Sequence, residues 1–138
     1  MPDEVLDAWD SVQWRQFRLK DSIARKGGGA RLHAGLVAQQ IDEAFRGKGA
    51  DASRYGLFCH DEWPAEPEER DAEGKLVKPA SPAGDAYAVR YEEALSIEAA
   101  YQRRRAERAE ARITALERRL DEMEAVFAAL GGPMESEE

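Results

Sequence analysis

Cysteine and histidine are scarce in this 138-residue chain, which contains one cysteine and two histidines. The single Cys59 cannot form an intrachain disulfide, so the fold does not depend on oxidation. Zinc sites require several converging Cys and His side chains. Besides Cys59, only His33 and His60 are available, and the neighbours Cys59 and His60 point to opposite faces of an expected strand. We therefore expect no metal site and no cofactor.

Long apolar runs and excess positive charge are also absent. No stretch approaches the roughly 20 apolar residues of a membrane span, and residues 1–4 lack the basic start of a secretion signal. We expect a soluble chain with no signal of its own and no membrane partner. The formal charge of -8 argues against a general nucleic-acid binder. The basic run at residues 103–105 is interpreted as a solvated, ion-paired helix face.

The C-terminal third of the sequence carries a long heptad repeat. Its seam positions alternate in spacings of four and three, which is typical of a coiled coil. The seam residues are Leu95, Ala99, Gln102, Ala106, Ala109, Ile113, Leu116, Leu120, Met123, Phe127 and Leu130. A seam of this length needs a second chain to cover it, and polar Gln102 is expected to fix the register. The alternative is a long helix that folds back on its own domain.

Charged residues on both sides of the seam indicate how the helices are oriented. With Ala99 at heptad position a, arginines occupy position g and glutamates occupy position e of the following heptad. The expected interchain pairs are Arg105 with Glu110, Arg112 with Glu117, and Arg119 with Glu124. A parallel arrangement pairs opposite charges, whereas an antiparallel one opposes like charges. The pattern predicts a parallel homo-oligomer, and the seam residues leave dimer and trimer open.

The first 90 residues are expected to form a small α+β head. Periodicity predicts a helix at residues 2–9, a strand at 12–19 with a bulge at 15–16, and a glycine turn at 27–29. It further predicts strands at 32–37, 55–59 and 87–91 and a helix at 38–45. The long helix follows over residues 91–132, ended by Gly131, Gly132 and Pro133, and residues 133–138 are expected to be a frayed acidic tail.

Residues 61–85 differ in composition from the rest of the head. They hold four of the six prolines and many acidic residues, and they contain almost no apolar side chains. Leu76 and Val77 follow closely on Glu73 and Gly74, so a long hairpin that turns at Glu73 and Gly74 is expected. We interpret the segment as a protruding arm, and a disordered surface loop is the alternative.

Catalytic patterns are weak. Lys20 and Ser22 would share one face of a strand, and a Ser-Lys pair can perform acyl transfer, but no oxyanion donors can be identified. A small hydrolase with an unrecognised site is kept as one rival function.

Four sequence blocks resemble a known family. They are VLDAW at residues 5–9, WRQFR at 14–18, ARLHAGLVAQQI at 30–41 and YAVRYEE at 87–93. Together with the coiled coil, they resemble the C-terminal intramolecular chaperone domain of phage tail fibres and tailspikes, the self-cleaving endosialidase type. The motif residues are His33, Gly35, Ala38, Gln39, Tyr87 and Tyr91, and the core from Gly35 to Gln39 is the most specific part.

The resemblance implies a homotrimer of α+β heads with hairpin arms and a parallel trimeric coiled coil. Such a domain helps an upstream β-rich fibre, its folding client, to fold and trimerise in the host cytoplasm, and is absent from the mature virion after self-cleavage with a Ser-Lys pair. The cleavage motif is a Ser-Asp pair followed closely by Arg-Leu-Lys. Residues 18–20 copy its last letters without the Ser-Asp pair.

Because the Ser-Asp pair is missing, we assign no catalytic role to Lys20 or Ser11. We expect a released or trimmed piece that trimerises and does not cut itself. The alternative function is a plain trimerisation or adaptor module of a phage or prophage particle.

Overall fold

Two short helices, α1 (Asp3–Trp9) and α3 (Ala38–Arg46), form the centre of the head. Asp3 and Glu4 lie in the first turn of α1, where negative charge stabilises the positive end of the helix dipole. The side chains that these helices bury are Val5, Leu6, Ala8 and Trp9 from α1 and Ala38, Ile41 and Phe45 from α3. The helical spacing of these residues explains why both helices were predictable from the sequence.

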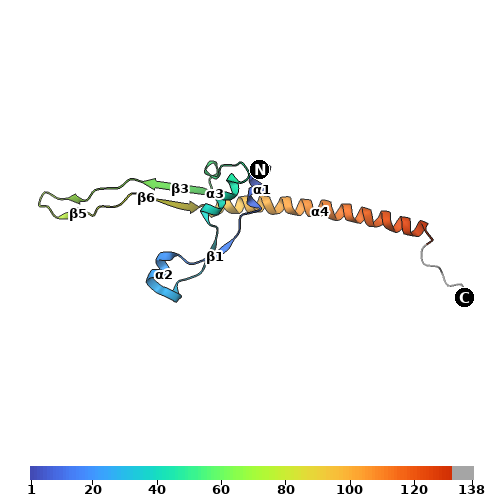
Figure 1. Ribbon diagram of the computed structural model, residues 1–138, viewed down its shortest axis with the longest axis horizontal. Coiled ribbons are helices and arrows are strands. Elements are labelled where there is room, and N and C mark those ends of the chain that lie inside the picture. Colours follow the sequence, from blue (N-terminus) through green and yellow to red (C-terminus); the bar gives the residue numbers. More distant parts are fainter. Residues whose placement is uncertain (132–138) are drawn as a thin grey trace. The chain divides into compact units, whose positions relative to one another are not determined.

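The structure, a computed structural model, describes residues 1–131. The chain consists of two compact units, Met1–Ala99 and Ala100–Glu138. The remaining elements are β1 (Arg15–Phe17), α2 (Lys20–Lys26), β2 (His33–Gly35), β3 (Phe58–Trp63), β4 (Glu69–Arg70), β5 (Leu76–Lys78), β6 (Gly84–Val89) and α4 (Tyr91–Ala129). Short 3-10 turns cover Gly27–Gly29 and Ala52–Arg54. The expected mixed α+β head followed by a long C-terminal helix is thereby confirmed (Figure 1).

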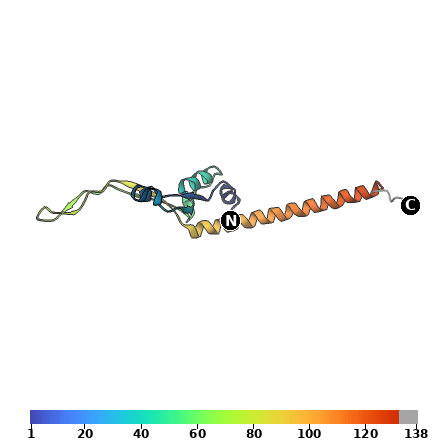
Figure 2. The ribbon, with the colours of Figure 1, turned by 90° about the horizontal axis from the view of Figure 1, so that it is seen from below.

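The strands form three separate antiparallel pairs rather than one sheet. β1 pairs with β2, β3 pairs with β6 over six residue pairs from Phe58↔Val89 to Trp63↔Gly84, and β4 pairs with β5. Both ribbon views show β3 and β6 side by side (Figures 1 and 2). With only two strands in each pair, every strand keeps one open edge.

Three expectations for the N-terminal strands were wrong. The pairing of β1 with β2 runs without a register shift, so there is no bulge at Arg15 and Gln16. Lys20 and Ser22 lie in helix α2 rather than on a strand, and residues two apart on a helix do not share a face. The third strand was expected to begin at Tyr55, but it begins at Phe58 and continues to Trp63.

Two tryptophans are hydrogen-bonded to the start of α4. The indole Nε1 of Trp9, almost fully buried, donates to Glu98 Oε2 at 2.6 Å, and that of Trp14 donates to the same oxygen at 3.3 Å. Hydrogen bonds to a charged acceptor are stronger than those between neutral groups. Glu98 therefore attaches both α1 and the segment just before β1 to the first turns of α4.

Helix α4 begins at Tyr91, as predicted, with Glu92 and Glu93 in its first turn. It runs without interruption for 39 residues, and Gly131 follows with a φ of 104°, a left-handed conformation that favours glycine after a helix end. The expected acidic tail lies outside the described residues. Within residues 1–131, no helix is both long enough and apolar enough to cross a membrane.

Replacement of Glu98 tests this attachment of α4. We expect Glu98→Ala to lower the free energy of unfolding by about 1–3 kcal/mol, because the buried Trp9 indole N–H loses its acceptor. Glu98→Gln keeps an acceptor and should lose less. The measurement is urea unfolding followed by tryptophan fluorescence at one fixed protein concentration. The control is Glu92→Ala, and an equal effect in the control would contradict the role of Glu98.

Candidate functional site

The seam of α4 is an exposed apolar row in the described part of the chain. Its large apolar members, Leu95, Ile113, Leu116, Leu120, Met123, Phe127 and Leu130, expose between 50% and 83% of their surface. Monomeric proteins rarely expose such a continuous apolar row, and rows of this kind mark interaction surfaces.

The first turns of α4 use two different faces. Ala94 and Ile97 are buried in the head, whereas Leu95 and Ala99 are exposed. Successive helix residues rotate by about 100°, so these two pairs lie on roughly opposite sides of the helix. In these first turns the head thus covers one face of α4, and the seam residues Leu95 and Ala99 remain exposed on the other face.

The apolar surface widens near the end of α4. Val126, 60% exposed, lies beside the seam at heptad position g and lines a shallow groove with Met123, Phe127 and Leu130. The groove is flanked by Arg119 and Glu122. The sequence analysis did not include Val126, although its position at g, after three arginines at g, was a visible signal.

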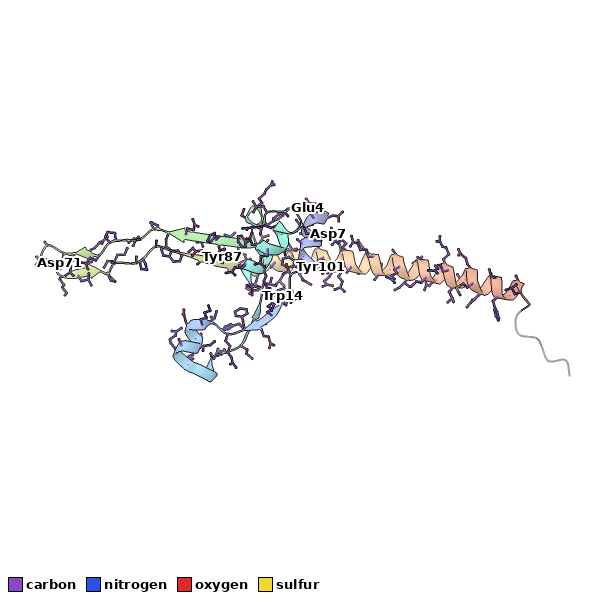
Figure 3. All side chains as sticks on the ribbon, viewed as in Figure 1. Glu4, Asp7, Trp14, Asp71, Tyr87 and Tyr101 are labelled. Carbon is purple, nitrogen blue, oxygen red and sulfur yellow. The ribbon has the colours of Figure 1, made fainter. Side chains whose placement is uncertain are left out.

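The arm is a long hairpin, and we use this name from here on for residues 58–89. Its tip turns at residues 71–74, which confirms the predicted turn; Figure 3 shows Asp71 there. Asp71 Oδ1 accepts hydrogen bonds from the backbone N–H groups of Glu73 and Lys75, and Gly74 has a φ of 82°. These bonds hold the turn in a defined shape, which favours the hairpin over the disordered loop.

Side chains on both strands stabilise the arm along its length. Near its base, the His60 ring stacks on Tyr87 at 4.1 Å, and its Nε2 lies 2.8 Å from Asp85 Oδ2. Farther out, the Trp63 indole lies over Gly84, so close that a Cβ at Gly84 would be 2.8 Å from the ring. Aromatic packing over a cross-strand glycine stabilises a ribbon that has no third strand.

The motif core around Gly35 contacts the start of α4. The backbone N–H of Leu36 donates to Tyr91 Oη at 3.1 Å. A Cβ at Gly35 would lie 2.1 Å from Tyr91 Oη, so only glycine fits there. On β1 and β2, Phe17 stacks on His33 with ring centroids 5.9 Å apart. The structure thus brings Gly35 and Tyr91 together, although they are 56 residues apart.

The motif residues Ala38, Gln39 and Tyr87 line one shallow groove. Its lining includes Phe17, Leu19, Ala38, Gln39 and residues 85–89, together with Tyr91. Ala38 is buried at the start of α3, and Gln39 is exposed. His33 is exposed on β2.

The described residues show no cluster of metal-ligating side chains. No three His, Cys, Asp or Glu side chains gather within residues 1–131 as metal ligands would. Ser11 Oγ donates to the carbonyl oxygen of Ala8. The Ser53 hydroxyl and backbone N–H both bond Asp51, and they lower the pKa of this carboxyl below its usual value. This interaction caps the 3-10 turn that begins at Ala52.

Comparisons with known proteins agree with this architecture. The family described as "Chaperone of endosialidase" matches residues 1–50. A solved structure titled as a novel intramolecular chaperone is 44% identical, with a TM-score of 0.72, over 78% of this chain and 90% of that one. The chain belongs to the endosialidase chaperone family. It is an intramolecular chaperone domain of the phage tailspike and tail-fibre type.

Two further relatives come from phage tail proteins. The tail spike protein of Escherichia virus K5 is 45% identical over 117 residues, which are 83% of this chain and 18% of that protein. The carboxy-terminal domain of the bacteriophage T5 L-shaped tail fibre, solved with its intramolecular chaperone domain, is 25% identical with a TM-score of 0.51. It is matched over 88% of this chain and 28% of that one. The chaperone domain therefore spans less than a fifth of the K5 protein.

One charged segment of the chaperone domain was overlooked in the sequence. Residues 15–35 hold six Lys and Arg side chains and one acidic residue, all six of the basic ones exposed. These six basic residues are dispersed over residues 15–35, whereas the arginines at residues 103–105 form a contiguous run that is conspicuous in the sequence. Counting net charge over each expected element would have found the dispersed residues.

Glycine replacements test the close contact at the motif core. We expect Gly35→Ala to lower the free energy of unfolding by about 1–3 kcal/mol, because the added Cβ collides with Tyr91. Gly28→Ala is the matched control, since nothing lies within 4 Å of a Cβ there, and it should leave stability unchanged or raise it by up to about 1 kcal/mol.

Combining Gly35→Ala with Tyr91→Leu separates collision from backbone effects. Removal of the tyrosine ring should make the glycine replacement less harmful than it is alone, as measured by thermal unfolding. Additive losses in the double variant would show that Tyr91 is not the group that Gly35 accommodates.

Proposed function

We propose that this chaperone domain forms a parallel homotrimer through the α4 seam and assists the folding and assembly of an upstream β-rich tail-fibre or tailspike segment. The observation that carries the proposal is the open seam on the face of α4 opposite the buried Ala94 and Ile97. A helix that folded back on its own domain would bury the seam, whereas in the first turns of α4 the head buries Ala94 and Ile97 and leaves Leu95 exposed.

The charge ladder supports a parallel orientation. Arg105, Arg112 and Arg119 stand at position g, and each meets a glutamate at position e of a neighbouring chain when three helices are in register. Exposed pairs of this kind contribute only about 0.2–1 kcal/mol each, so they select orientation and register. Burial of Ile113, Leu116 and the other apolar seam residues supplies most of the stability.

Three chains fit the seam and the family. The resemblance to tail-fibre chaperones implies a trimer, and apolar Val126 at position g extends the apolar surface beyond the two seam positions that suffice for a dimer. A wider apolar face is better covered when each helix packs against two neighbours.

The trimer explains how such a domain would act on its client. Interwoven β-strands have high contact order, so their pairing is slow and the chains must be aligned before it begins. A C-terminal coiled coil ties three chain ends together and raises the effective concentration of their strands towards the millimolar range. The arm then offers open strand edges on which client strands can be held during this search.

Self-cleavage is not assigned to this chain. Lys20 and Ser22 lie two residues apart in one helix, and Ser11 bonds the backbone of its own chain. We infer that the domain is active as a folding aid without a catalytic role for these residues. A plain trimerisation module is the second candidate, which the exposed seam alone would also fit.

A light-scattering measurement on seam variants tests trimerisation. We expect the unaltered chain to have three times its mass of 15.4 kDa, and Leu116→Asp to have the mass of one chain at the same concentration, because three carboxylates would meet in the apolar seam. Ala111→Asp, on the outer face of α4, is the control and should remain a trimer. A monomeric unaltered chain would contradict the proposal.

Shortening the arm separates the chaperone from the plain trimerisation module. Residues 64–83 are replaced by Asn-Gly, a two-residue turn suited to join the paired Trp63 and Gly84. We expect the shortened chain to trimerise normally but to lower the yield of folded client several-fold.

The client in this experiment is the fibre segment encoded upstream, expressed as one chain with the domain. Its SDS-resistant trimers are quantified with the full domain, with the shortened arm, and with an unrelated trimeric coiled coil in place of the domain. Equal yields from all three would favour the plain trimerisation module.

A further inference from the structure

Two exposed segments of the head carry opposite charges of equal size. Residues 15–35, which we call the basic excursion, hold six Lys and Arg against one acidic residue, a net charge of +5. The arm, residues 58–89, holds eight Asp and Glu against three Lys and Arg, a net charge of -5. The whole chain has a charge of -8, so the basic excursion stands out against its surroundings.

The basic excursion is poorly covered by its own chain. Helix α2 has no buried residue, and the apolar side chains of Leu19, Ile23 and Leu32 are 45% to 60% exposed. Figure 1 shows α2 beyond β1, away from α1 and α3. A seven-residue helix is not stable in water without packing partners, so this exposed surface is one that a partner would stabilise.

The charges of the basic excursion are not neutralised within the described residues. Arg15 bonds the side chains of Gln13 and Gln40, and Arg25 bonds the carbonyl oxygen of Asp21. Within residues 1–131 the side chains of Arg18, Lys20, Lys26 and Arg31 form no hydrogen bond or ion pair with another residue. These four cations are therefore available to an acidic partner.

The arm has the complementary surplus. Two of its three cations are used locally, since Lys78 pairs with Glu66 and Arg70 pairs with Glu68. In the described part of the chain, the carboxylates of Asp61, Glu69 and Glu73 have no ion-pair partner. Leu76 and Val77 add exposed apolar surface on the neighbouring strand.

We propose that the basic excursion of one copy docks on the acidic arm of the next copy. The inference rests on the proposed trimer. Around a threefold axis, neighbouring copies meet through two different surfaces, and three such head-to-tail contacts close a ring. A chain with one basic and one acidic projection has the pair of surfaces that this symmetry requires. Within one chain, no described ion pair joins the two projections.

The contact can be weak and still form in the trimer. Exposed ion pairs are individually feeble and are screened by salt. The seam already holds the three heads together, however, so the docking step is intramolecular and its effective concentration is high. The contact would orient each arm, while the seam would supply most of the stability of the trimer.

Carbodiimide cross-linking tests the contact directly, because this reagent joins a lysine amine only to a carboxylate that touches it. Labelled (15N) and unlabelled chains are unfolded and refolded together, and linked peptides are identified by mass. We expect Lys20 or Lys26 to be joined to carboxylates of residues 61–73 in peptides of mixed label. The Lys78 to Glu66 link, from a pair within one chain, is the internal control for the reaction.

Charge reversal then tests whether charge causes the contact. Arg18→Glu with Arg31→Glu, which keeps both reactive lysine amines, or Glu69→Lys with Glu73→Lys, should each reduce the mixed-label link between the two projections about tenfold or more, and all four changes together should restore it. Lys48→Glu with Arg54→Glu lies outside both projections and should have no effect.

Several outcomes would overturn the inference. They are a trimer that shows the control link but no mixed-label link, links of a single label only, or failure of the combined reversal to restore the link. Tight binding of a short DNA duplex, lost on reversal of Lys20 and Lys26 in a trimer without the mixed-label link, would assign the basic excursion to nucleic acid instead. An unaltered chain with the mass of a monomer would overturn the proposed trimer itself.

Discussion

The division of helix α4 into two faces is the constraint on which the other features depend. Ala94 and Ile97 are buried in the head, and Glu98 accepts hydrogen bonds from two tryptophans of the N-terminal segment. Because these contacts occupy one side of the first turns, the seam residues Leu95 and Ala99 stay exposed on the other side. The head is thus fixed to a helix whose other side suits self-association.

The same attachment explains how motif blocks that are far apart in the sequence meet in the structure. Tyr91 starts α4, and its hydroxyl accepts the Leu36 N–H beside Gly35. The arm leaves the head at Phe58 and returns at Val89, two residues before α4 begins at Tyr91. The first turn of α4 therefore joins the β1–β2 pair, the arm and the seam within a few residues.

Much of this architecture was predictable, for identifiable reasons. The seam and α3 follow from apolar spacing, and the arm's turn follows from Glu73 and Gly74 beside a polar, proline-rich stretch. The contact of Gly35 with Tyr91 was not predictable from spacing, because it joins residues far apart in the chain. Helix α2 was missed because apolar alternation in the preceding residues was extended too far, and a short exposed helix has no buried face to reveal its period.

The arm's open edges have a further consequence for kinetics. A flat, apolar edge would bind client strands tightly and grow into aggregates. Here prolines at positions 64, 67, 79 and 82 remove backbone donors, and dense negative charge repels acidic strands. In the role proposed for the arm, any client strand that pairs with it would make an incomplete ladder and leave quickly, so a wrongly registered strand would detach and pair again before the shaft closes.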